Sequence, residues 1–379
     1  MAAEVLATVG LAVTVFEAKP SPARKFLMAG KSGLNLTLDG DFDHLLAGYG
    51  ESAGALRPAL QAFDNRALRD WAERLGQEMF TGSTGHVFPR KMKASPLLRA
   101  WLARLDGLGV TLHRRWRWTG WEDDALRFDT PDGVRTVHPD VTVLACGGAS
   151  WARLGSDGAW ADWVPSTPFQ PSNVGLRVTW SDHMTKHFGT PIKGVTWRAG
   201  GQTSRGEAVI SAKGLEGGGI YTISATVRAR HGVIVDLLPD LSQTEVIARL
   251  QKPRGKTTLS NHLRKVLRLS PVKLALLREW VGPLPKAPEV LAATIKGLTV
   301  PVQGLGDMDS AISTVGGVPF DTLDEGFMLR DRPGVFCAGE MLDWDAPTGG
   351  WLLTGCFATG AWAARHAAAW VKSTERAQP

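Results

Sequence analysis

The chain has 379 residues, of which 44% are hydrophobic and 21% charged, and its formal net charge is +6. This length suits two or three domains rather than one core, and without an apolar run of transmembrane length we expect a soluble, cytoplasmic protein. Cys146, Cys337 and Cys356 form no Cys-x-x-Cys pair, which argues against a disulfide framework, a zinc ribbon and a redox-active cysteine pair.

The first predicted elements are an apolar helix over residues 2–8 and a buried strand over residues 12–17 that ends in Glu17. In a βαβ dinucleotide unit, the acid that ends the second strand binds the ribose hydroxyls, so Glu17 is a candidate cofactor ligand. The first strand and its Gly-x-Gly-x-x-Gly turn would lie upstream of Met1. We therefore interpret the chain as an N-terminally shortened dinucleotide-binding protein. A chain that simply begins with a surface helix would leave Glu17 and its strand unexplained.

Residues 99–117 are the densest basic stretch of the sequence analysis and also contain tryptophans. Basic residues interleaved with tryptophans resemble a platform on which nucleic-acid bases stack. Residues 111–119, however, alternate like a half-exposed strand, which favours a solvated basic face and disfavours a nucleic-acid partner. Together with three further segments, this strand predicts a small meander that leads to Gly147-Gly148. The further strands are predicted over residues 125–130, 134–138 and 141–145.

From about residue 168 the sequence consists of short alternating segments separated by glycines. Residues 168–238 and 295–310 predict an inserted β-rich substrate domain, and residues 239–294 predict a helical subdomain, because leucines recur there at helical spacing. The cofactor domain then comprises residues 1–167 and 311–379, and we expect the substrate in the cleft beside the insert. Strands of the insert are predicted over residues 175–180, 194–198, 208–211, 220–224, 232–237 and 298–305.

No metal site and no nucleoside triphosphate site is predicted. His183 and His187 have the spacing of a ligand pair, but no Glu follows His183 as the zinc-protease motif requires. Gly255-Lys256-Thr257 matches the end of a phosphate loop, but Leu250 stands where that loop needs glycine.

Near the C-terminus, a short apolar strand that begins at Val335 and ends in a small residue is followed by an acidic loop, by Gly349-Gly350 and by a helix over residues 351–372. A helix N-terminus carries a partial positive charge of about half a unit, which suits a pyrophosphate or the pyrimidine edge of a flavin. The two glycines would let the backbone approach such a flat group. An ordinary glycine-rich junction is the alternative.

Several motifs together resemble one family. They are Phe16-Glu17, the run Arg-Lys-x-x-x-Ala-Gly-Lys-x-Gly-x-Asn-Leu-Thr over residues 24–37, and the segments 145–150, 314–318 and 335–352. In order and spacing the chain is similar to the BaiN/YhiN-like family of bacterial NAD(P)/FAD-dependent flavoproteins over nearly its whole length. The run over residues 24–37 is the specific part of this resemblance.

The resemblance implies an α/β fold with a Rossmann-like FAD-binding domain of the three-layer β-β-α type, an inserted β domain and a small helical subdomain. It implies FAD bound in an extended form. The ribose lies at Glu17, the AMP half at Gly147-Gly148 and the pyrimidine end at residues 348–352. The implied FAD contacts are Glu17, Arg24, Lys25, Gly30, Asn35, Leu36, Trp118, Gly147, Gly148, Gly339, Glu340, Asp343, Thr348, Gly349, Gly350, Trp351 and Leu352.

The implied chemistry is two-electron transfer. Hydride passes from NAD(P)H to FAD and then to a small organic acceptor, for which an activated carbon–carbon double bond is one form. Lys31 and His86 are the candidate catalytic residues, as proton donors. Two alternatives stay open: a nucleic-acid-associated flavoprotein, and a cofactor-free truncated remnant.

Overall fold

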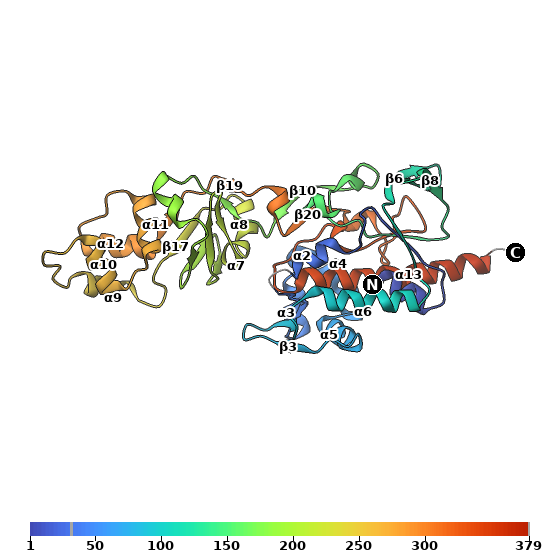
Figure 1. The fold of residues 1–379 in the computed structure, drawn as a ribbon, viewed down its shortest axis with the longest axis horizontal. Coiled ribbons are helices and arrows are strands. Elements are labelled where there is room, and N and C mark those ends of the chain that lie inside the picture. Colours follow the sequence, from blue (N-terminus) through green and yellow to red (C-terminus); the bar gives the residue numbers. More distant parts are fainter. Residues whose placement is uncertain (31–32, 378–379) are drawn as a thin grey trace. The chain divides into compact units, whose positions relative to one another are not determined.

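The computed structural model describes residues 1–30 and 33–377 (Figure 1). The chain forms two compact units with separate hydrophobic cores. Unit 1 comprises Met1–Gln170 and Ser313–Pro379, and unit 2 comprises Pro171–Ile312. β10 (Thr167–Ser172) pairs with β20 (Ser313–Gly317).

Unit 1 contains two pairs of parallel strands. β1 (Thr14–Glu17) pairs with β5 (Thr111–Arg114), and β9 (Thr142–Leu144) pairs with β21 (Val335–Cys337). In open α/β sheets, ligands bind beyond the carboxyl ends of parallel strands. Glu17 stands at such an end, Gly147-Gly148 follows the end of β9, and the predicted acidic loop with Gly339 and Glu340 follows the end of β21.

The longest helix of unit 1, α13, begins at Trp351 directly after Gly349-Gly350 and packs against α1 and α4. Fully buried alanines at positions 363, 364 and 367 let it approach its neighbours closely. No helix within the described part of the chain is both long and apolar enough to cross a membrane. The helices of unit 1 are α1 (Ala2–Thr8), α2 (Arg24–Ala29), α3 (Phe42–Ala47), α4 (Ala53–Ala62), α5 (Asn65–Arg74), α6 (Ala94–Gly107) and α13 (Trp351–Ala377).

Glu4 is a buried acid in the otherwise apolar helix α1. Its carboxylate accepts the indole N–H groups of Trp71 at 3.1 Å and Trp101 at 2.8 Å, and a guanidinium N–H of Arg104 at 2.8 Å. A buried carboxylate is tolerated only when it is paired and hydrogen-bonded, and here the three donors come from α5 and α6. Glu4 therefore fastens α1 to both helices.

A second, antiparallel layer consists of β6 (Arg117–Glu122), β7 (Ala125–Thr130) and β8 (Gly133–Val137). The single strand predicted over residues 111–119 is wrong. Arg115 has a positive φ of 61°, so the chain turns there: β5 pairs with β1 and β6 begins the antiparallel sheet. The strand predicted over residues 141–145 is present as β9, but it pairs with β21 and does not belong to the meander.

A small antiparallel sheet places two predicted site segments side by side. Its strands run in the order β2 (Thr37–Leu38), β4 (His86–Pro89) and β3 (Met79–Thr81). Leu38 lies opposite His86, and the Leu36 N–H donates to the Val87 carbonyl at 2.9 Å. The Asn35-Leu36-Thr37 motif therefore runs beside the loop that carries His86.

Unit 2 contains two antiparallel sheets, with strand orders β12-β15-β16-β11-β19 and β14-β13-β17-β18. The predicted strand over residues 220–224 is wrong, because this segment is helical. Ile220, Ile223 and Val227 are buried at helical spacing. The strands are β11 (Leu176–Arg177), β12 (Pro191–Ile192), β13 (Thr196–Ala199), β14 (Gln202–Ser204), β15 (Ala208–Ser211), β16 (Gly214–Glu216), β17 (Val233–Asp236), β18 (Leu298–Val300) and β19 (Gly304–Leu305).

Three helices of unit 2 begin at capping residues that the sequence supplies. Ser242, Thr258 and Ser270 each accept a backbone N–H from the first turn of their helix, and Ser242 and Glu245 form a capping box. Strands and helices share one hydrophobic cluster, which includes Trp197 and Leu276. The helices are α7 (Gly218–Tyr221), α8 (Ser224–Arg228), α9 (Gln243–Leu250), α10 (Leu259–Leu267), α11 (Pro271–Val281) and α12 (Pro288–Lys296).

Candidate functional site

Glu17 ends β1 next to a basic loop. Its Oε1 accepts the Lys19 N–H at 2.8 Å. Burial raises the pKa of the Glu17 carboxyl, while the Lys19 N–H and the nearby Arg24 charge oppose that shift. Arg24 donates its Nε–H to Ser21 at 3.0 Å and, with Gly30, lines a pocket of about 520 Å³. The predicted ribose ligand and the predicted adenosine ligand therefore interact electrostatically.

Lys25 connects α2 to the turn after β21. Its Nζ donates to Glu340 Oε2 at 2.6 Å and to Ser150 Oγ at 2.8 Å, and the Lys25 and Glu340 side chains are 27% and 14% exposed. Gly148 packs against the same group: a Cβ there would lie 2.1 Å from Thr314 Oγ1 and 3.3 Å from the Glu340 carboxyl carbon. The structure thus brings Lys25, Gly148 and Glu340 together.

Gly339 and Asp343 shape the turn that carries Glu340. Gly339 has a φ of 80°, a conformation that favours glycine, and its N–H donates to Thr359 Oγ1 at 2.9 Å. Asp343 Oδ1 accepts the Gly316 N–H at 3.1 Å. The carboxylate of Asp343 therefore binds the 314–318 motif to this turn.

The loop before α13 is fixed between two strands of the small sheet. Gly349 and Gly350 have φ values of 110° and 108°. A Cβ on Gly350 would lie 2.4 Å from the Thr37 carbonyl carbon, and one on Gly349 would lie 2.6 Å from Cε1 of His86. Thr37 and His86 explain why neither position carries a side chain, and the approach of a flat ligand to this backbone stays a prediction. The same geometry places the His86 ring at the N-terminus of α13.

Other predicted contacts serve mainly to position this loop. Trp351 donates its indole N–H to the Leu45 carbonyl at 2.9 Å, and its own carbonyl accepts the Tyr49 hydroxyl at 2.8 Å. Leu36 is fully buried, whereas Leu352 is half-buried against the same core. Thr348, also half-buried, precedes the two glycines.

Four buried polar atoms in the described part of unit 1 have no hydrogen-bond partner: Asn35 Oδ1, His86 Nδ1, Trp118 Nε1 and Ser156 Oγ. Asn35, His86 and Trp118 are themselves predicted site residues. Ser156 Oγ lies 3.1 Å from where a Cβ on Gly147 would be. Buried polar groups in proteins are normally satisfied, so each orphaned one calls for a partner such as a ligand, an ion or a water molecule, as do Thr196 Oγ1 and Trp280 Nε1 of unit 2. The residues present therefore fit FAD, which offers hydroxyl, amide and phosphate groups along its length.

Trp118 lies in β6 among other tryptophans. Its ring meets those of Trp121 and Trp163 edge-on, at centroid distances of 4.7 and 5.2 Å. These contacts fix the indole plane while leaving its N–H without a partner. The ring itself thus belongs to the packing of unit 1.

Of the two predicted proton donors, the structure describes only His86. Lys31 lies outside the described residues, whereas His86 is half-buried in β4. The three cysteines are poor nucleophiles, because burial raises the pKa of Cys146 and of Cys356 to about 12 and that of Cys337 further still. Across residues 1–30 and 33–377, no three His, Cys, Asp or Glu side chains are grouped to hold a metal ion.

Sequence reasoning missed three polar residues that complete this region. Ser150 and Thr314 contact Lys25 and Gly148, and both lie inside motifs that carried the family resemblance. Because Ser150 and Thr314 lie inside those motifs, their hydroxyl groups could have been recognised from the sequence as candidate polar contacts. Ser156 had no such signal, because only the fold brings it to Gly147.

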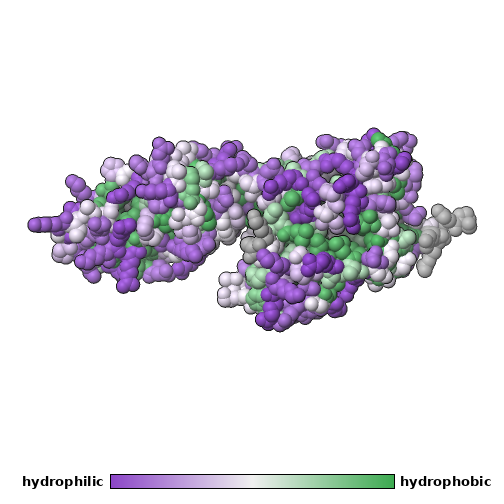
Figure 2. Space-filling view, viewed as in Figure 1, coloured by the Kyte–Doolittle hydropathy of each residue, from purple (hydrophilic) through white to green (hydrophobic). Residues whose placement is uncertain are grey.

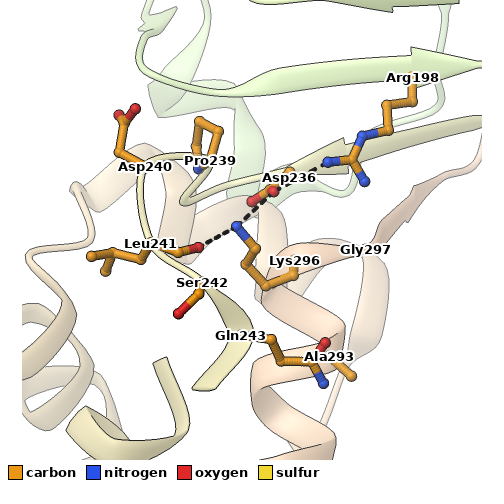
Figure 3. Close-up of a pocket in the computed structure, with 10 residues that line it drawn as sticks. All are labelled: Arg198, Asp236, Pro239, Asp240, Leu241, Ser242, Gln243, Ala293, Lys296 and Gly297. Carbon is orange, nitrogen blue, oxygen red and sulfur yellow. Dashed lines mark hydrogen bonds and ion pairs between the residues drawn. The ribbon is translucent and has the colours of Figure 1, made fainter. Parts of the chain in front are cut away.

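Unit 2 has a pocket of its own, of about 490 Å³, in which a buried ion pair lies (Figure 3). Lys296 Nζ donates to Asp236 Oδ2 at 2.8 Å and to the carbonyls of Leu238 at 2.7 Å and Leu241 at 2.5 Å. Arg198 approaches the same carboxylate at 3.5 Å. The three N–H groups of Lys296 are thereby occupied, which is the arrangement of a structural ion pair.

The family model described as the HI0933-like protein Rossmann domain matches residues 1–366. The chain belongs to the HI0933-like family. The match covers both units and every predicted site residue.

The chain is also similar to one named relative and to solved structures. The HI0933-like chain is 26% identical to 3-dehydro-bile acid delta(4,6)-reductase of Clostridium scindens, over 94% of this chain and 92% of the relative. A mutant FrdA of E. coli quinol fumarate reductase matches with a TM-score of 0.50 and 13% identity, over 98% of this chain and 69% of that one. The 3-ketosteroid-delta4-(5alpha)-dehydrogenase of Rhodococcus jostii RHA1 matches with a TM-score of 0.44 and 12% identity, over 98% and 93%.

These findings confirm the BaiN-like family resemblance and the predicted fold class. They also confirm that the chain is an enzyme of a flavin-dependent oxidoreductase family. The FAD contacts at individual residues stay predictions.

Proposed function

We propose that this protein is an FAD-dependent reductase that takes hydride from NAD(P)H and reduces a small organic acceptor with an activated carbon–carbon double bond. One observation supports this most: all four unpartnered buried polar atoms of the described part of unit 1 lie in or against residues assigned to FAD. The name of the Clostridium scindens relative, a delta(4,6)-reductase, supports reduction of a double bond.

The adenosine half of FAD would lie between β1 and α2. Glu17 accepts hydrogen bonds from the ribose hydroxyls, because its carboxylate is held in place by a single backbone N–H from Lys19. Arg24 and Lys25 offset the charge of the phosphates. Lys25 is already oriented by Glu340 and Ser150, so its ammonium group loses little freedom on binding.

The flavin end would lie at the N-terminus of α13. The positive end of a 27-residue helix stabilises negative charge on the pyrimidine edge. Gly349 and Gly350 hold that end against Thr37 and His86. FAD, when bound, supplies the two-electron transfer, while the protein supplies orientation and electrostatics.

His86 is our candidate for the residue that provides the proton. Reduction of an activated double bond adds hydride to one carbon and a proton to the other. An imidazole exchanges protons near neutral pH, and Nδ1 of His86 is buried without a partner beside Gly349. Lys31, the other predicted donor, keeps that role as a prediction.

The test is an FAD titration of the purified protein, followed by anaerobic addition of NADH or NADPH. We expect stoichiometric FAD binding, loss of the oxidised flavin absorbance on adding one nicotinamide, and its return on adding an unsaturated ketone. A protein that binds FAD but is reduced by neither nicotinamide would contradict the proposed donor. Failure to bind FAD would contradict the whole proposal.

His86→Gln sharpens this test. Loss of a general acid slows acceptor reduction by about 10²–10⁴-fold. FAD binding and the reduction of FAD by the nicotinamide should stay unchanged, because neither step needs that proton. His183→Gln, at an exposed histidine of unit 2, is the matched control. If both variants reduce the acceptor at the wild-type rate, His86 is not the proton donor.

A further inference from the structure

The basic charge of this protein is concentrated in unit 2. Residues 171–312 contain 19 Lys and Arg and 10 Asp and Glu, a net charge of +9, although the whole chain carries only +6. Unit 1 is therefore net acidic. Within unit 2, residues 246–278 hold nine Lys and Arg and no acidic residue. The charge of this stretch is therefore of one sign, unlike that of residues 99–117, which include Asp106 and which our sequence analysis weighed as a nucleic-acid site.

Six of these nine side chains form what we call the basic face: Lys252, Arg254, Lys256, Arg264, Lys265 and Arg268. All six are exposed, and none has an ion-pair partner among residues 1–30 and 33–377. The stretch over residues 99–117 differs, since Arg104 pairs with Glu4 at 2.8 Å and Arg117 pairs with Asp157 at 2.6 Å. The basic face therefore keeps its full charge for a partner.

The fold collects the basic face on one part of unit 2. Arg264 and Lys265 lie on the exposed side of α10, and Arg268, also exposed, is the residue at which this helix ends, with a positive φ of 55°. Leu263 and Leu267 occupy the opposite, buried side. The other three residues lie in the loop 251–258, which is exposed throughout and leads directly into α10.

The surroundings of the basic face are hydrophilic. α9, α10 and α12 gather at one end of unit 2, and the surface drawn over that end is mainly hydrophilic (Figures 1 and 2). Every exposed residue from 251 to 268 is charged or polar, or is glycine or proline. The face also offers neutral hydrogen-bond donors at Gln251, Thr257 and Asn261.

We propose that the basic face binds the phosphate backbone of double-helical nucleic acid without reading its sequence. A polyanion is the partner that matches six unpaired cations. An interfacial membrane helix would turn apolar side chains outward, and none of the exposed large hydrophobic residues lies between positions 246 and 278. A single-strand platform needs exposed aromatic rings, and this stretch contains none.

The expected salt dependence follows from the number of contacts. Each phosphate neutralised on duplex DNA contributes a slope of about −0.9 to the plot of log affinity against log salt concentration. Six contacts therefore give a slope of about −5. Each basic residue removed should reduce the magnitude of the slope by about 1.

The experiment measures binding of the full chain to a fluorescent 30-base-pair duplex, a single strand of equal length and phosphatidylserine vesicles. One variant carries Arg264→Gln, Lys265→Gln and Arg268→Gln. The matched control carries Arg66→Gln, Arg99→Gln and Arg135→Gln, three exposed arginines of unit 1. A second variant carries Lys252→Gln, Arg254→Gln and Lys256→Gln, so that a folding defect in α10 cannot decide the result.

We expect the wild type and the control to bind the duplex with the full salt slope. Each basic-face variant should lose about three units of slope and, in low salt, at least tenfold in affinity. Equal binding by the variants and the control would overturn the proposal, and so would the absence of duplex binding in low salt. Tighter binding to the single strand or to the vesicles than to the duplex would assign the face to that other partner.

Discussion

Two lysine–carboxylate pairs, one in each unit, look alike in geometry and differ in their surroundings. In unit 2, Lys296 lies 2.8 Å from Asp236, whose side chain is 2% exposed. In unit 1, Lys25 lies 2.6 Å from Glu340, whose side chain is 14% exposed. Asp236 Oδ1 also accepts the Leu238 N–H at 2.9 Å, so both oxygens of this carboxylate have a partner.

The Lys25 pair lies in a region with unsatisfied groups. Glu340 packs against Gly148, and the adjoining Gly147 faces Ser156 Oγ, which has no partner. The Lys296 pair, in contrast, links the end of β17 to the end of α12 through backbone carbonyls. The comparison indicates that a short ion pair alone does not mark a ligand site. Unpartnered buried atoms do not separate the two cases, because Thr196, whose Oγ1 also has no partner, lies opposite Asp236 in the paired strands β13 and β17. The two carboxylates differ instead in exposure, which is 2% for Asp236 and 14% for Glu340.

The largest effect on stability is expected for Lys296→Met. Removing one partner of a buried ion pair costs about 3–5 kcal/mol, because the remaining charge is left uncompensated. Asp236 would keep Arg198, at 3.5 Å, and the nearby charge of Lys273 as its cationic neighbours. Urea unfolding followed by circular dichroism measures the loss.

The control for this prediction is Lys193→Met, which breaks the pair with Glu207 at 3.3 Å, where both side chains are mostly exposed. An exposed pair contributes about 1 kcal/mol or less. Equal losses in the two variants would remove the distinction between a buried structural pair and a surface pair. The double variant Lys296→Met, Asp236→Asn should recover part of the loss, since it leaves no buried charge.

Lys25→Met should act mainly on cofactor binding. Loss of a charge-assisted hydrogen bond of about 1.5–3 kcal/mol weakens FAD binding by about 10- to 150-fold. The stability of the cofactor-free protein should change far less than in Lys296→Met, since Lys25 is 27% exposed. Fluorescence titration with FAD, together with urea unfolding, measures both quantities.

Lys372→Met, at an exposed lysine of α13, is the matched control and should change neither quantity. A large loss of stability in Lys25→Met with unchanged FAD affinity would mean that this pair is structural, like the pair in unit 2. The two lysines would then no longer represent two kinds of site.

The sequence predicted regular elements best where strands are bounded by turns. The strands over residues 125–130 and 208–211 have the bounds that were predicted, because alternation and flanking glycines define both. The segment 220–224 was misassigned, because its helical spacing emerges only when Val227 is included. The turn at Arg115 could not be foreseen, because a non-glycine residue rarely adopts positive φ.

The candidate site was predicted as a set of residues but not as a network. Lys25 and Glu340 are 315 positions apart, so their contact depends on how α2 and the turn after β21 pack. The roles of the glycines were also incomplete. Gly148 and Gly350 were explained by a ligand, whereas the structure shows protein atoms within 2.5 Å of where a Cβ would be. Motifs identify required residue types without revealing which neighbour imposes the requirement.

The smallest expected effect tests whether a site residue lowers stability in the absence of its ligand. Burial raises the pKa of the Glu17 carboxyl above its ordinary value of 4.5, so the folded protein holds that proton more tightly than the unfolded chain. Stability should therefore fall as pH rises from about 4.5 through the raised pKa. The Glu17→Gln variant should not show this decline of stability with pH, because its amide does not titrate. Its amide oxygen can still accept the Lys19 N–H.

Without FAD, Glu17→Gln should be slightly more stable than the wild type at pH 7, with no such gain in acid, below the ordinary pKa of the carboxyl. With FAD the order should reverse, since an amide oxygen accepts ribose hydroxyls more weakly than a carboxylate does. Unfolding curves at both pH values, with and without FAD, measure this. Asp236 offers the contrast, because its charge is compensated within the fold and its removal should lower stability whether or not FAD is present. A loss of stability in Glu17→Gln without FAD would place Glu17 with Asp236, as a structural acid rather than a ligand held ready for the cofactor.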